Sequence, residues 1–110
     1  MKDDKIYLTH ILECIRYIES YVTGGKEEFF NSRLIQDAVI RNLEVIGEAV
    51  KQISSDMRKQ YEDIPWREMA GLRDVLIHDY FGVDLGTVWG VVDLELPRLK
   101  RLIKKLLEDH

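Results

Sequence analysis

Apolar side chains recur at intervals of three and four residues along most of this 110-residue chain. This spacing gathers them on one side of an α-helix, because one helical turn takes about 3.6 residues. No useful stretch shows the period of two that is typical of a half-buried β-strand, and no Asn-Gly hairpin signal occurs. We therefore predict an all-α fold, and a chain of this length has room for a single domain over residues 1–110.

Two long helices are predicted in the first half of the chain, over about 4–22 and 32–53. Thr23-Gly24-Gly25 should end the first one, since glycine readily adopts the left-handed conformation that follows a helix. Ser54-Ser55-Asp56 should end the second, and a short helical segment is expected over about 56–61.

A third helix is predicted to begin at Pro65, which fits the first helical position because no N–H is needed there. It should run to about Tyr80, with Gly82 placed to cap it. Asp84 is a natural N-cap for the last helix, and Pro97 predicts that this helix is kinked or split nearby. The expected architecture is a bundle of four main helices, and its wide apolar arcs would allow one face to be buried in a homodimer.

The charge of the chain is unevenly distributed. Its formal net value of −4 argues against a protein that coats nucleic acid through bulk electrostatics. Five cations nevertheless crowd one stretch of the last predicted helix: Arg98, Lys100, Arg101, Lys104 and Lys105. A looser basic set consists of Lys51, Arg58, Lys59 and Arg67. Each set fits a local surface that holds a few phosphates, and equally an ordinary solvated helix face.

Cys14 is the only cysteine, which excludes an internal disulfide and a thiolate zinc site. Its position on an apolar stripe predicts a buried, inert thiol. The charged start Met1-Lys2-Asp3-Asp4 does not resemble a signal peptide, and no apolar run approaches the roughly 20 residues needed to span a bilayer. We therefore expect a cytoplasmic protein that does not associate with membranes.

Polar and titratable residues gather most densely near the end of the third predicted helix, at Arg73, Asp74, His78, Asp79 and Tyr80. At about 100° per residue, Arg73 and Tyr80 lie nearly in line, and Asp74 is adjacent to His78. Arg73 and His78 point about 140° apart, so an undistorted helix does not aim both at one target. The length of the arginine, fraying at the helix end or a second subunit would have to bring them together.

Such residues suit cleavage of RNA by its own 2′-hydroxyl, which needs proton transfer and positive charge beside the phosphate. Histidine titrates in the required range, and arginine offers planar, bidentate donors to phosphate oxygens, so neither a metal nor another cofactor is expected. Each residue also has a structural explanation. The helix dipole favours His78 in a last turn, Asp74 and His78 form an i,i+4 pair, and Tyr80 fits a core aromatic.

The segment from Arg73 to Tyr80 matches the Arg-x4-His-x-Tyr signature of HEPN domains. Its flanks resemble one branch of that family, the HepT-like ribonuclease toxins of the HepT–MntA toxin–antitoxin systems. The similar segments are residues 41–49, 64–66 and 78–89, and the resemblance extends from the first helix to Pro97.

This resemblance implies a HEPN-like homodimer in which the two signatures face each other across a cleft and cleave RNA without a metal. Arg73 would contact the scissile phosphate, His78 would act as the acid–base group, and Asp74 would orient one of them or the RNA. An MntA-like nucleotidyltransferase antitoxin would attach AMP to Tyr80. The bulky negative charge beside the arginine would then repel RNA and silence the toxin.

Asn42 lies on the apolar stripe of the second predicted helix. A buried amide must be hydrogen-bonded, so Asn42 either ties helices together or lines the same cleft as a supporting residue. Arg41, Glu44 and Glu48 share another face, for which a salt-bridged exterior is expected.

Two other functions fit parts of the pattern. His78-Asp79 also occurs in metal-dependent HD phosphohydrolases, but that chemistry needs more ligands, and the other histidines are His10 and the terminal His110. A non-catalytic helical module that assembles with a nucleotidyltransferase is the second alternative. A chelator would separate the first from a metal-independent ribonuclease, and a His78→Ala variant would separate the second.

Overall fold

The computed structural model of the chain describes residues 2–78 and 84–109. Within those ranges every long element is a helix and no strand occurs, which confirms the predicted all-α fold. The elements are α1 (Lys2–Tyr21), α2 (Gly25–Asn31), α3 (Arg33–Lys51), α4 (Ser55–Gln60), α5 (Trp66–His78), α6 (Leu85–Gly90), the π-helical segment η2 (Val91–Glu95) and α7 (Leu96–Glu108).

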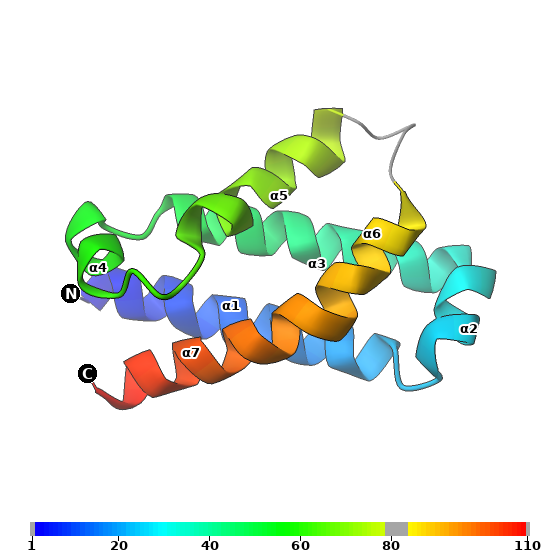
Figure 1. Cartoon of the computed structure of the whole chain (residues 1–110), viewed down its shortest axis with the longest axis horizontal. Coiled ribbons are helices and arrows are strands. Elements are labelled where there is room, and N and C mark those ends of the chain that lie inside the picture. The colour runs from blue at the N-terminus through cyan, green and yellow to red at the C-terminus, as the bar shows by residue number, and fades with distance from the viewer. Residues whose placement is uncertain (1, 79–83, 110) are drawn as a thin grey trace.

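The long helices lie roughly along one direction, with α1 packed against both α3 and α7 (Figure 1). Helix α5 packs on α3, while the short α2 contacts α3 and α6. Figure 1 places α4 and both termini at one end of the molecule and α2 at the other. In the same view, α5 runs away from α4, so its C-terminal end is separated from α4 by the length of the helix (Figure 1).

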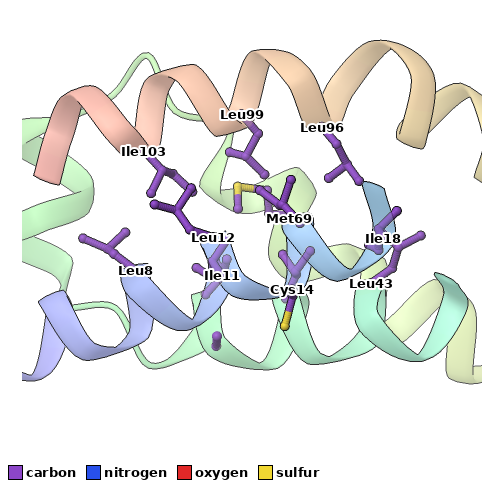
Figure 2. Close-up of a cluster of buried hydrophobic side chains, with 14 of the residues drawn as sticks. Leu8, Ile11, Leu12, Cys14, Ile18, Leu43, Met69, Leu96, Leu99 and Ile103 are labelled. Carbon is purple, nitrogen blue, oxygen red and sulfur yellow. The ribbon is translucent and has the colours of Figure 1, made fainter. Parts of the chain in front are cut away.

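Side chains of the predicted apolar stripes form one continuous core. Figure 2 shows Leu99 and Ile103 of α7 directed toward α1, where Leu12 meets them. Met69 of α5 reaches the same cluster, and Leu43 of α3 lies in it as well. Burial of each such side chain stabilises the fold by about 1.5–3 kcal/mol. Cys14 belongs to this core and is 3% exposed, which confirms the prediction of a buried thiol.

The turn after α1 contains the glycine stop that the sequence predicted. Gly25 has a φ of +85°, a conformation that costs glycine little, and its N–H donates to the Val22 carbonyl at 2.9 Å. Helix α2, which starts at this residue, was not predicted. It is only seven residues long and buries the single side chain of Phe29, so it leaves almost no periodic signal.

The start of α3 agrees with the sequence prediction to within one residue. Ser32 caps it, and the Ser32 hydroxyl accepts a hydrogen bond from the Ile35 N–H at 3.2 Å. Helix α5 likewise begins one residue later than predicted, at Trp66. Pro65 precedes the helix and its carbonyl accepts the first helical bond, from the Met69 N–H at 3.1 Å.

The last helical run is interrupted close to Pro97, as predicted. Asp84 caps α6 by accepting a hydrogen bond from the Gly86 N–H at 2.9 Å, which confirms its predicted role. The chain then widens into η2, where the Leu96 N–H donates to the Val91 carbonyl five residues earlier. Pro97 explains this widening, because it has no N–H to offer the carbonyl four residues before it.

No helix in the described ranges is long and apolar enough to cross a membrane.

Candidate functional site

The backbone of α5 carries both proposed catalytic residues, Arg73 and His78, within its last two turns. They are five residues apart, which corresponds to about 7.5 Å along a helix axis. The structure describes the side chains of α5 only as far as Leu72, so the orientations of Arg73, Asp74 and His78 stay predictions. Tyr80 and the predicted cap Gly82 lie outside the described residues.

The N-terminal half of α5 is firmly attached to the rest of the fold. The Trp66 ring is buried, and its indole N–H donates to the Tyr61 carbonyl at 3.0 Å. One turn later, Met69 is 4% exposed within the core (Figure 2). These two anchors fix the axis of the helix that leads to Arg73 and His78, as a site built on a rigid element requires.

Asn42 is half-buried on α3, the helix that packs against α5. Its side-chain amide donates to the Ala38 carbonyl at 2.9 Å, four residues earlier in the same helix. This hydrogen bond uses one of the two N–H groups of the amide and lies within α3. The proposed role of Asn42 in a catalytic cleft stays a prediction.

The neighbouring polar face of α3 is a salt-bridged exterior, as the sequence predicted. Arg41 approaches Glu44 at 3.6 Å with most of its side chain exposed. Glu48, one turn further on, is exposed as well. An ion pair of this kind contributes little to stability, because water screens it.

A groove of about 370 Å³ separates α5 from the last helical run. Its apolar walls come from α5 on one side and from η2 and α7 on the other: Pro65, Met69, Leu72, Val91, Leu96 and Leu99. Glu68, Glu95 and Arg98 supply the charged groups. The groove reaches Leu72, the residue immediately before Arg73. We did not predict it, although the spacing of residues 65, 68, 69 and 72 follows one face of a helix.

In each of the two basic sets that the sequence indicated, one half-buried cation bonds to the rest of the fold. Arg58 of the looser set is half-buried and donates to the Val50 carbonyl near the end of α3 at 2.8 Å, so its role is structural. Lys100 of α7 pairs with Glu19 of α1 at 3.0 Å. The other cations of α7 are exposed: Arg98, Arg101, Lys104 and Lys105.

His10 lies on the exposed face of α1 beside Ile6 and Glu13 and is remote in sequence from α5. Among the residues that the structure describes, no group of three or more His, Cys, Asp or Glu side chains is arranged to hold a metal ion.

The chain is similar to a family of known proteins along most of its length. A family model described as "Ribonuclease HepT-like" matches residues 11–106. The chain is 52% identical over 109 residues to the "Gamma-glutamylcyclotransferase and putative RNase" of Methanocaldococcus jannaschii. That alignment covers 98% of this chain and 49% of the relative, so the chain spans about half the length of that protein.

Two shorter relatives align along nearly their whole length. A "Putative RNase" of the same organism is 47% identical over 109 residues, covering 98% of this chain and 90% of the relative. The "Probable ribonuclease HepT" of Thermococcus cleftensis is 45% identical over 106 residues, covering 96% of each. No solved structure matches the chain significantly.

The family model covers α3, α5 with the Arg73–His78 segment, and most of α7, and the relatives align with almost all of the chain. The chain therefore belongs to the HepT-like ribonuclease family.

Proposed function

We infer that the chain is a metal-independent endoribonuclease and the toxin of a toxin–antitoxin system. The observation that carries this inference is the family match, because it spans the whole of α5 with Arg73 and His78. The attachment of α5 through Trp66 and Met69 supports it, since cleavage requires side chains held on a rigid element.

The proposed reaction uses the 2′-hydroxyl of the RNA as the nucleophile. Loss of its proton lets the 2′-oxygen form a bond to the adjacent phosphorus, and the bond from phosphorus to the 5′-oxygen breaks. The leaving 5′-oxygen takes up a proton, so the products are a 2′,3′-cyclic phosphate and a 5′-hydroxyl. His78 is proposed to transfer these protons, and Arg73 to stabilise the charge that builds on the phosphate oxygens.

A second copy of the chain completes the proposed site. On one straight helix, Arg73 and His78 point about 140° apart, whereas two helices facing each other would allow one arginine and the opposite histidine to share a phosphate. We propose a homodimer with the two α5 ends at its cleft, where Asp74 and Asn42 support the catalytic pair.

Regulation is proposed to act on the same cleft. An MntA-like nucleotidyltransferase antitoxin would transfer AMP from ATP to the hydroxyl of Tyr80, releasing pyrophosphate. Tyr80 follows His78 by two residues, so the added phosphate would lie close to the catalytic pair and would repel RNA.

Cleavage of a labelled single-stranded RNA, in the presence and absence of EDTA, tests the proposal. We expect EDTA to leave the rate unchanged, and Arg73→Ala and His78→Ala each to lower it by about 10²–10⁴-fold. Arg67→Ala and His10→Ala are matched controls, since Arg67 lies exposed on the same helix and His10 lies exposed on α1. Both controls should stay within about threefold of the parent.

Each alternative function predicts a different result. Loss of cleavage in EDTA would point to metal-dependent phosphohydrolase chemistry and contradict the proposal. A folded His78→Ala protein that is as toxic to cells as the parent would identify a non-catalytic module that assembles with a nucleotidyltransferase. Removal of the 2′-hydroxyl by a deoxynucleotide at the cleavage position should abolish cleavage there, and continued cleavage would overturn the proposed nucleophile.

A further inference from the structure

The outer face of α7 carries a row of cations that form no ion pair with any residue that the structure describes. Arg98, Arg101, Lys104 and Lys105, here called the α7 basic row, are all exposed. Within the described ranges, the α7 cation that forms an ion pair with another helix is Lys100, through Glu19 of α1. Lys100 is not part of the row. Residues 96–107 contain no acidic residue, although the whole chain has a net charge of −4. This local excess of positive charge is therefore open to an anionic partner.

The row is directed away from the core by the helical repeat. Leu99, Ile103 and Leu106 are at most 4% exposed and fix the inward side of α7. At about 100° per residue, Arg101 lies opposite that stripe, with Arg98 and Lys105 within about 60° of it. From Arg98 to Lys105 the helix rises about 10 Å, so the row spreads its four positive charges along a line that a short segment of a polyanion can follow.

Arg98, at the N-terminal end of the α7 basic row, lies at the groove between α5 and the last helical run. Arg98 lines that groove together with Leu72, which directly precedes Arg73 in α5. A strand that lies along the row would therefore end at Arg98, beside the segment that carries the proposed cleft. The groove itself, with Glu68 and Glu95 near Arg98, does not offer a phosphate a positive surface. Figure 1 shows α7 running from this region toward the end of the molecule that holds both termini.

We propose that the α7 basic row binds the phosphate backbone of single-stranded RNA outside the cleft and guides it toward the α5 signature. This proposal rests on the proposed ribonuclease function and adds a binding surface to it. The apolar side of α7 is buried in the core, so the helix has no free apolar face to insert into a lipid surface. Arginine favours phosphate through bidentate hydrogen bonds, and two of the four cations are arginines.

A binding assay that does not depend on cleavage tests the row. The probe is a fluorescent single-stranded 2′-O-methyl RNA of about a dozen nucleotides, which lacks the free 2′-hydroxyl, and binding is followed by anisotropy over a range of salt concentrations. The variant is Arg98→Gln/Arg101→Gln/Lys105→Gln in the full chain. The matched control, Lys26→Gln/Arg33→Gln/Arg41→Gln, removes the same charge from exposed positions of α2 and α3.

We expect the row variant to bind at least tenfold more weakly at about 0.1 M salt than the parent. The slope of log Kd against log salt should fall by about 2, because each lost phosphate contact removes about 0.7 from it for a single strand. The control should keep the parent slope. An equal loss of RNA affinity in the variant and the control would show that only the net charge of the protein matters. An unchanged affinity in the variant would show that RNA does not bind at α7. Either result overturns the proposal.

Two further measurements separate the row from other partners and from the proposed function. Polyglutamate that competes with the RNA probe for the parent at equal charge concentration would assign the row to an acidic protein surface and overturn RNA as its ligand. Cleavage by the parent protein is measured on unmodified RNA. If RNA binding depends on the row but the parent cleaves no RNA, the proposed ribonuclease function is refuted and RNA binding by the row is supported. If the parent cleaves RNA but the row variant binds the probe as the parent does, the ribonuclease function is supported and RNA binding by the row is refuted.

Discussion

Asp4 should be the carboxylate on which stability depends most. It is 1% exposed, at the start of α1, and it accepts two hydrogen bonds from Ser54, fifty residues away in sequence. The Ser54 N–H donates to one carboxylate oxygen at 2.8 Å and the Ser54 hydroxyl to the other at 2.6 Å. The same hydroxyl accepts from the Met57 N–H at 3.2 Å and so caps α4. Asp4 thus joins the first helix to the segment that leads into α5.

The expected cost of removing this carboxylate follows from its two bonds. Hydrogen bonds to a charged group contribute about 1.5–3 kcal/mol each, and a buried donor left without a partner costs about 1–3 kcal/mol. The two bonds share one network, so their values do not simply add. We expect Asp4→Ala to lower the free energy of unfolding by about 3 kcal/mol, or the Tm by roughly 12 °C for a domain of this size. Asp4→Asn keeps one acceptor oxygen and should cost about half as much.

Urea unfolding followed by far-ultraviolet circular dichroism measures these changes. Asp3→Asn is the matched control, because the neighbouring carboxylate is exposed, and it should change stability by less than about 0.5 kcal/mol. Ser54→Ala is the second variant, and the double variant with Asp4→Ala should lose clearly less than the two single losses combined. An Asp4→Asn or Asp4→Ala loss no larger than that of Asp3→Asn would refute the reasoning.

Two further predictions concern tyrosine and cysteine chemistry. Tyr80→Phe should prevent the addition of AMP by the antitoxin while the protein stays toxic, whereas the control Tyr17→Phe, at an exposed tyrosine of α1, should be modified and silenced normally. Intact-mass spectrometry measures the modification and growth assays measure the toxicity. AMP on another residue of Tyr80→Phe would refute the assignment. Burial, with the nearby Glu13 carboxylate, raises the pKa of the Cys14 thiol. Iodoacetamide at about pH 8 should therefore react with Cys14 far more slowly in the folded protein than in urea, and equal rates would contradict its burial. Because the folded-state pKa is the higher one, this thiol should lower the free energy of unfolding only as the pH rises above the ordinary thiol value of about 8.5.

Local sequence signals predicted much of the helical framework. Gly25, Ser32 and Asp84 act through the backbone of their immediate neighbours, so their effects do not depend on the rest of the fold. Pro97 likewise changes the hydrogen-bonding pattern within one turn and produced the predicted interruption. The short α2 was missed because one buried side chain, Phe29, gives no period to detect.

Part of the candidate site was likewise predictable from the sequence, and part of it was not. The identity and spacing of Arg73 and His78 are properties of the sequence, and the helix that carries them was predicted from the start signal at Pro65 and the cap expected at Gly82. The sequence also showed the cations of α7, but it left a phosphate-binding surface and a solvated face equally open. Only the fold separates Lys100, which pairs with Glu19 across two helices, from the cations that stay exposed.

The sequence by itself therefore determined which long segments are helical, where most of them stop and which residues can perform chemistry, because these properties depend on neighbours within a turn or two. Tertiary structure alone decided that Asp4 meets Ser54, that Lys100 pairs with Glu19, and that a groove opens between α5 and α7. These features depend on how helices far apart in sequence pack against each other, and the side chains that set this packing act together rather than one at a time.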